Sequence, residues 1–149
     1  MNEYEAVMQE AEGEASTGRF KDAYNTLGRA LWLGGPQDQE CRRRRGTYAF
    51  HVGHSRLDRV AESSTPGQPG PDAAPDLRGP NALKETLIKA GCWLARAEAY
   101  LLSASEGADD DARGDIEQDL ERTKEEQERF RQLCRELDID LFSSTTTSR

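Results

Sequence analysis

The chain has 149 residues and a formal net charge of -8 at pH 7, and no uninterrupted apolar run approaches transmembrane length. This length suits one domain that is large enough to bury a hydrophobic core. Charged residues make up 32% of the chain, but leucine, alanine and aromatic residues recur at regular spacing, which argues against a disordered chain. The acidic balance disfavours general adhesion to nucleic acid or to an anionic membrane.

The basic residues concentrate in the middle of the chain, while both ends are acidic. Residues 41–80 carry seven basic and four acidic side chains, which favours a protein partner. The three cysteines, Cys41, Cys92 and Cys134, lie far apart and form no CxxC motif. Reduced thiols are the simplest interpretation. Because the N-terminus also lacks the pattern of a secretory leader, we expect a cytoplasmic protein.

Residues 4–15 and 20–31 predict two amphipathic helices. In each run the apolar residues return at spacings of three or four, so they share one side of an α-helix. They are Tyr4, Val7, Met8, Ala11 and Ala15 in the first run, and Phe20, Ala23, Tyr24, Leu27, Ala30 and Leu31 in the second. Gly18 separates the runs, and the sequence from Gly34 to Pro36 ends the second. Two such helices joined by a tight turn pack as an antiparallel hairpin.

Residues 4–37 resemble one unit of the tetratricopeptide repeat, a helical hairpin of about 34 residues. The matching positions are Ala11 in the first helix, Gly18 and Phe20 at the turn, Ala23 and Ala30 in the second helix, and Pro36 at the close. Glu14 departs from the pattern, because an aromatic residue is expected there, and no later segment repeats the full pattern. The resemblance implies an adaptor that holds a partner segment in a groove. An ordinary helical hairpin without repeat ancestry is the alternative.

Residues 38–62 predict a third helix that begins at Asp38. Its apolar side contains Gly46, Ala49, Phe50, Gly53, Leu57 and Val60. Glycine weakens a helix by about 1 kcal/mol relative to alanine, so two glycines on the apolar side predict the close approach of a neighbouring helix. Residues 63–80 contain five prolines and three glycines, and therefore predict a solvent-exposed linker.

Residues 81–105 predict the most apolar helix of the chain, with two apolar stripes. One stripe contains Leu87, Ala90, Gly91, Leu94, Ala97 and Leu101, and the other contains Ile88, Cys92, Ala95, Ala99 and Leu102. A helix that is apolar on two sides is usually packed between neighbours. We therefore expect this helix at the centre of the C-terminal half.

Residues 106–110 interrupt the helical pattern, and residues 111–141 predict a charged final helix. Its seam positions recur at spacings of four and three, through Ile116, Leu120, Thr123, Gln127, Phe130, Cys134, Leu137 and Leu141. The favoured interpretation is a surface helix packed on the preceding one, although a heptad-like seam would also allow a homo-oligomer to form through residues 111–141. Residues 142–149 are expected to be a frayed tail.

The run from Arg42 to Arg45 is the densest basic cluster, and Arg56 and Arg59 add charge further along the same helix. Successive helical residues turn by about 100°, so the run does not form one flat patch. Guanidinium groups bind phosphates and acidic peptides well. The favoured interpretation, however, is that these arginines pair with the acidic first and last helices.

His51, His54 and Asp58 follow one another at helical spacing, as ligands of a divalent transition metal can. The pattern lacks a fourth ligand and the catalytic glutamate of zinc-protease helices, so surface histidines and no metal site are the favoured interpretation. Trp32 and Trp93 are expected to be packing residues. Nucleotide-binding, hydrolase and di-iron motifs are absent from the sequence, so we expect no cofactor and no enzyme.

These patterns predict an all-α protein of about five helices in antiparallel hairpins, with a tetratricopeptide-like N-terminal half and a helical hairpin in the C-terminal half. Residues 1–62 and 81–141 would form the two parts. The predicted function is a non-catalytic scaffold or adaptor that binds a partner peptide or helix through Glu5, Met8, Glu12, Arg42, Arg45 and Phe50. Two alternatives stay open: a small acidic chaperone of the repeat type for one effector or subunit, and a regulatory module that contacts nucleic acid through the arginine run.

Overall fold

The computed structural model describes residues 2–33, 38–63 and 80–137, which form five α-helices and no strand. The helices are α1 (Glu3–Ser16), α2 (Phe20–Leu33), α3 (Asp38–Ser63), α4 (Pro80–Glu106) and α5 (Asp110–Glu136). The predicted all-α class is thus confirmed, and every predicted helix is present. Residues 64–79 of the predicted linker, the predicted stop at 34–36, Leu141 and the predicted tail at 142–149 lie outside the described residues.

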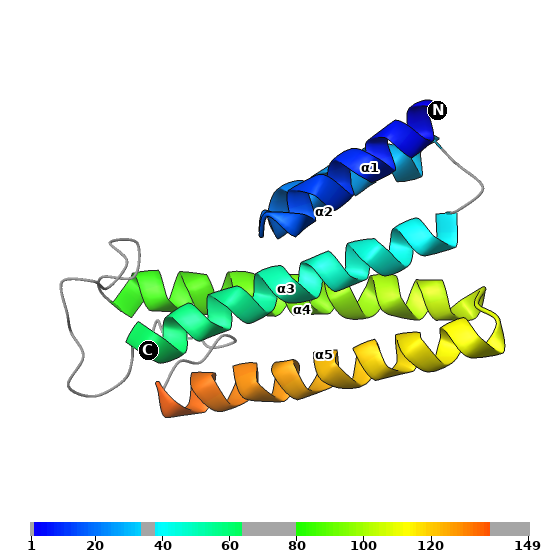
Figure 1. The fold of residues 1–149 in the computed structure, drawn as a ribbon. Coiled ribbons are helices and arrows are strands. Elements are labelled where there is room, and N and C mark those ends of the chain that lie inside the picture. The colour runs from blue at the N-terminus through cyan, green and yellow to red at the C-terminus, as the bar shows by residue number, and fades with distance from the viewer. Residues whose placement is uncertain (1, 34–37, 64–79, 138–149) are drawn as a thin grey trace.

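Consecutive helices run antiparallel to one another (Figure 1). Helices α3, α4 and α5 lie side by side as an up-down-up bundle, and the α1–α2 hairpin packs across α3. None of the described helices combines the length and the apolar character needed to cross a lipid bilayer.

The turn between α1 and α2 is a Schellman motif. The Gly18 amide donates to the Ala15 carbonyl at 3.0 Å, and the Arg19 amide donates to the Glu14 carbonyl at 3.0 Å. This geometry needs a left-handed residue after the helix, and Gly18 supplies it with a φ of +82°. The predicted turn at Gly18 is therefore confirmed, and it fixes where α2 begins.

One side of α3 packs on α4 with almost no space between the two backbones. A Cβ atom added at Gly46 would lie 2.8 Å from Leu101 Cγ, and one added at Gly53 would lie 2.9 Å from Leu94 Cγ. The close approach that the two glycines predict is confirmed. It also joins the two predicted parts of the chain, because the hydrophobic core that contains Ala49 and Val52 of α3 includes Trp93 and Ala97 of α4.

Helix α4 buries only one of its two apolar stripes. Leu87, Leu94 and Leu101 are fully buried between α3 and α5, as expected. The second stripe, from Ile88 to Leu102, is exposed along its length. The prediction that α4 has neighbours on both apolar sides is therefore wrong, because α3 and α5 both lie on the side of the leucines.

The apolar seam of helix α5 faces the inside of the bundle. It begins at the N-cap Asp109, whose carboxylate accepts a hydrogen bond from the Ala112 amide at 2.8 Å. Ile116, Leu120, Thr123 and Cys134 are buried. The seam packs inside the bundle, as the favoured interpretation predicted. It is therefore not a free surface through which residues 111–136 could form a homo-oligomer.

The two tryptophans lie in opposite environments. Trp93 is 7% exposed and meets the Tyr24 ring edge-on, with 4.9 Å between ring centroids. Trp32, one residue before the end of α2, is 89% exposed. The prediction of a packing residue is confirmed for Trp93 and wrong for Trp32, because the apolar side of α2 passes through Leu27 and Ala30 instead. All three cysteines are free thiols.

Candidate functional site

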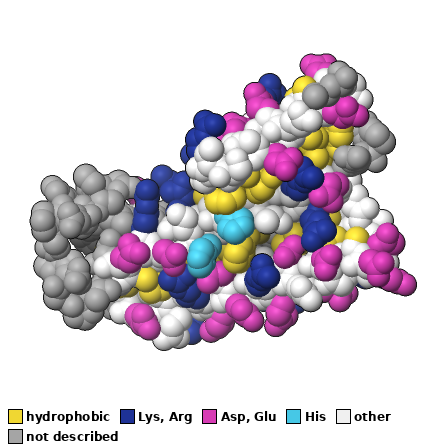
Figure 2. All heavy atoms as spheres, viewed as in Figure 1, with side chains coloured by type: hydrophobic (Ala, Val, Ile, Leu, Met, Phe, Trp, Pro, Cys, Tyr) yellow, Lys and Arg dark blue, Asp and Glu magenta, His cyan; other side chains and the backbone are white. Residues whose placement is uncertain are grey.

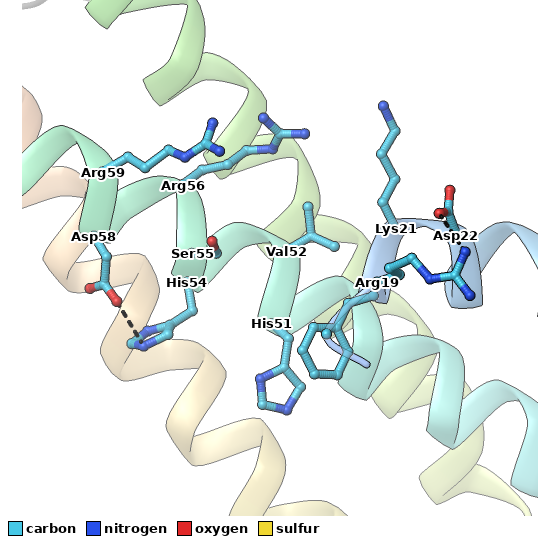
Figure 3. A pocket seen from close by; sticks show the side chains of 12 residues that line it. Arg19, Lys21, Asp22, His51, Val52, His54, Ser55, Arg56, Asp58 and Arg59 are labelled. Carbon is cyan, nitrogen blue, oxygen red and sulfur yellow. Dashed lines mark ion pairs between the residues drawn. The ribbon is translucent and has the colours of Figure 1, made fainter. Parts of the chain in front are cut away.

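An open hollow of about 540 Å³ lies between the start of α2 and the C-terminal half of α3 (Figure 3). Two short segments line it: residues 18–22, which leave the Schellman turn, and residues 51–59, which cover two turns of α3. Basic side chains outnumber acidic ones in this lining by four to two. The basic residues are Arg19, Lys21, Arg56 and Arg59, and the acidic ones are Asp22 and Asp58.

The basic groups face one side of the hollow. Lys21, Arg56 and Arg59 extend along the same side of α3, whereas the histidines lie on the other side (Figure 3). The two acidic side chains of the lining each form an ion pair with an arginine: Asp22 is 4.0 Å from Arg19, and Asp58 is 2.8 Å from Arg129 of α5. In the space-filling view the two histidines lie near the middle of this face, with basic side chains on several sides (Figure 2).

A closed ring of four charged or polar groups supports the histidine side of the hollow. His54 Nδ1 is 2.9 Å from Glu126 and its Nε2 is 3.3 Å from Asp58. Arg129 completes the ring at 2.8 Å from Asp58 and 3.4 Å from Glu126. Burial alone would lower the pKa of Arg129, but its bonds to these carboxylates raise it. The ring ties α3 to α5 and keeps both His54 nitrogens directed at carboxylates.

His51 is held by aromatic contacts instead. Its ring stacks on Phe20 with 4.4 Å between centroids and meets Phe50 edge-on at 5.6 Å. Burial lowers the pKa of His51, and the nearby His54 and Arg122 lower it further, while Asp119 opposes them. The ring is therefore neutral at pH 7 and acts as part of the wall between α2 and α3.

We expect this arrangement to make stability depend on pH. The native pKa of His51 lies below its ordinary value of 6.5, so the unfolded chain binds the proton more readily as the pH falls through that value. The contribution of His51 to the stability of the fold is complete above about pH 6.5 and is lost progressively below it. Urea unfolding at pH 7.5, 6.5 and 5.5 should show that the free energy of unfolding falls more steeply with decreasing pH for the wild type than for His51→Gln. Parallel losses in the two proteins would contradict this assignment.

The arginine run is distributed over the bundle, as helical geometry predicted. Arg42 donates to Ser103 Oγ of α4 at 3.0 Å, and Arg43 lies 3.8 Å from Asp119 of α5. Arg44 pairs with Glu40 within α3 at 3.0 Å, and Arg45 reaches between α2 and α4. Pairing with the acidic last helix is confirmed for Arg43, and the run forms no continuous basic patch.

The residues predicted to bind a partner do not meet on one open surface. Met8 is 7% exposed and belongs to the core, so it cannot line a groove. Arg42 and Arg45 are turned toward α4, and Phe50 is partly buried under the two histidines. Glu5 and Glu12 are exposed on α1. The prediction that Met8 lines a partner groove is therefore wrong, because the side of α1 that contains Met8 is buried in the hydrophobic core.

The hollow itself was not predicted as a unit from the sequence. The sequence analysis considered His51, His54 and Asp58 as one set and Arg56 and Arg59 as another, but it did not connect either set with residues 19–22, which lie about thirty or more positions away. The signal that points to the site is a basic turn, Gly18 to Asp22, at the start of one helix together with a basic turn at the end of the next. Among the described residues, no group of three His, Cys, Asp or Glu side chains could hold a metal ion.

Comparison with known proteins adds no family. No protein-family model, curated protein or solved structure matches the chain.

Proposed function

We propose that the protein is a non-catalytic interaction module that binds an acidic segment of a partner protein in the hollow between α2 and α3. The observation that carries this proposal is the gathering of Arg19, Lys21, Arg56 and Arg59 around one open depression. Arginine and lysine side chains that share a concave surface attract carboxylates by both charge and hydrogen bonding. This keeps the adaptor class expected from the sequence and moves its surface from the first helix of the hairpin to the hairpin's turn.

The apolar part of the same wall favours a peptide over a small anion. Phe20 lines the hollow and is only partly buried beside His51. A segment with an aliphatic or aromatic side chain next to two or more carboxylates would match both features. Such a site resembles other protein interfaces, where an apolar contact sits within a polar rim.

A direct test uses a fluorescein-labelled peptide that contains alternating glutamate and leucine, followed by fluorescence anisotropy at 50 and 300 mM NaCl. We expect saturable binding that weakens with salt, because the charges are solvent-exposed. The double variant Lys21→Glu/Arg59→Glu should lower the affinity by roughly tenfold or more, since each 1.4 kcal/mol is a factor of about ten.

The matched control is Lys89→Glu/Lys124→Glu, which makes the same change in charge at two exposed lysines on α4 and α5 outside the hollow. Its affinity for the peptide should stay within about twofold of the wild type. Equal weakening by the control and the double variant would mean that only the overall charge matters, and the site would be wrong. A single-stranded oligonucleotide of equal charge is measured in parallel, and tighter binding of the oligonucleotide would instead favour the nucleic-acid alternative.

A further inference from the structure

Helix α4 carries an exposed apolar stripe. Its members are Ile88, Cys92, Ala95, Ala99 and Leu102, all of them exposed. Ile88 is 40% and Leu102 is 48% exposed, although both are large aliphatic side chains. The spacing of four, three, four and three residues is that of a helix–helix seam, and the stripe runs for roughly 20 Å along α4.

The order of side chains in the stripe is symmetric. Ile88 and Leu102 lie at equal distances on either side of Ala95, with small residues between them. If a second α4 lies antiparallel on the first with a two-fold axis at Ala95, each Ile88 meets Leu102 of the other copy. The small central residues then allow the two helices to approach to the short end of the usual interaxial range, about 8 Å.

The charges beyond the stripe have the same symmetry with opposite signs. Lys84 and Glu106 are equally far from Ala95 in sequence and lie on the same side of α4 as the stripe. Glu106 is exposed and Lys84 is partly so. An antiparallel pair would place each Lys84 opposite Glu106 of the other copy. A parallel pair would bring like charges together, which destabilises helix pairs.

The surface next to the stripe can widen the contact. A groove of about 390 Å³ runs beside Ala99, and its other lining residues are Leu31 of α2, Arg42 of α3, and Tyr100 and Ser103 of α4. The residues that follow Leu31 are also exposed, with Trp32 at 89% and Leu33 at 38%. A single pair of helices buries less than the roughly 1,200 Å² of a standard interface, so this neighbouring apolar surface matters for stability.

We propose that two copies of this chain associate through this stripe of α4, antiparallel about a two-fold axis at Ala95. This surface lies on another helix from the basic hollow, so the proposal does not rest on the proposed function. The contact is modest in area, and we expect a dissociation constant of roughly tens of micromolar for the dimer.

Sedimentation equilibrium of the full chain between 5 and 200 μM tests the proposal, with a reducing agent present so that the exposed thiol of Cys92 forms no disulfide. The wild type should shift from monomer to dimer across this range. Ala95→Glu places two carboxylates on the two-fold axis and should abolish the dimer, while the helical circular dichroism and melting temperature stay unchanged because Ala95 is exposed. A monomeric wild type at 200 μM, or a dimer that survives Ala95→Glu, would overturn the proposal.

Charge reversal tests the orientation. Lys84→Glu and Glu106→Lys should each weaken the dimer by about tenfold at low salt, because each creates two repulsive contacts across the two-fold axis. An equimolar mixture of these two variants should form a heterodimer, in which every contact is again between opposite charges. A Lys84→Glu protein that dimerises as tightly as the wild type, or more tightly, would overturn the antiparallel arrangement, as would a mixture that stays monomeric under conditions where the wild type dimerises.

Discussion

Replacing Gly46 or Gly53 by alanine is expected to destabilise the protein by about 1–3 kcal/mol, the usual cost of overpacking a core. At an exposed helical site the same change stabilises by up to about 1 kcal/mol. The sign reverses here because the added Cβ meets backbone as well as side chain. At Gly46 it would lie 3.2 Å from the Ala97 carbonyl oxygen, and at Gly53 it would lie 3.2 Å from the Ala90 carbonyl oxygen. Urea unfolding monitored by circular dichroism measures the change.

Two other glycines provide controls within the same chain. A Cβ at Gly114 in α5 would meet nothing within 4 Å, so Gly114→Ala should stabilise the protein by about 0.5–1 kcal/mol. At Gly91 the atoms nearest to an added Cβ would be those of the Phe130 ring, the first of them at 2.8 Å. Because the ring can shift, the change in stability caused by Gly91→Ala should lie between that of Gly46→Ala and that of Gly114→Ala. If Gly46→Ala and Gly114→Ala changed stability equally, the close contact of α3 and α4 would be wrong.

Truncating Arg45 is expected to cost about 2–4 kcal/mol, far more than truncating an ordinary surface arginine. Its guanidinium donates to the Tyr24 carbonyl at 3.1 Å and to the Tyr100 hydroxyl. It also lies over both tyrosine rings, 4.0 Å from the centroid of Tyr24 and 5.0 Å from that of Tyr100. Hydrogen bonds from a charged donor contribute about 1.5–3 kcal/mol, and a partly desolvated cation–π contact adds about 0.5–2 kcal/mol.

The variant Arg45→Lys separates shape from charge. Lysine keeps the positive charge but lacks the planar group that stacks on a ring while donating in two directions, so we expect it to recover less than half of the lost stability. The control is Arg29→Ala, which removes an ion pair with Glu10 whose side chains are 61% and 53% exposed. Exposed pairs contribute about 0–1 kcal/mol. If Arg45→Ala were no less stable than Arg29→Ala, the proposed role of Arg45 in holding the fold together would be wrong.

Local sequence signals were sufficient for the helices and for the closest helix contact. Periodic apolar residues and the turn at Gly18 place α1 and α2, and the glycine spacing in α3 identifies the side that approaches α4. These features depend on residues within a few turns of one another, so one sequence carries them. The environment of Trp32 was not predictable in the same way, because burial depends on which distant helix covers a surface.

The candidate site was predictable only in fragments for the same reason. The basic residues at 56 and 59 are visible in the sequence, but the hollow exists because the α1–α2 hairpin lies across α3 and brings Lys21 to them. For Arg45 the structure separates residues that look alike in the sequence. In the sequence it is the last of four similar arginines, whereas in the structure it is the one that enters the core, where the missing side chain of Gly28 leaves room for its guanidinium.

The dispersal of the arginine run limits how the length of α3 can change. Three of these four side chains contact other helices: Arg42 reaches α4, Arg43 reaches α5 and Arg45 reaches α2. Gain or loss of one residue early in α3 would rotate everything after it by about 100°, and the contacts of Arg42, Arg43 and Arg45 with the other helices would all be mismatched in a single step. Substitutions along α3 can be accepted one at a time, but an insertion or deletion there acts on the whole bundle at once.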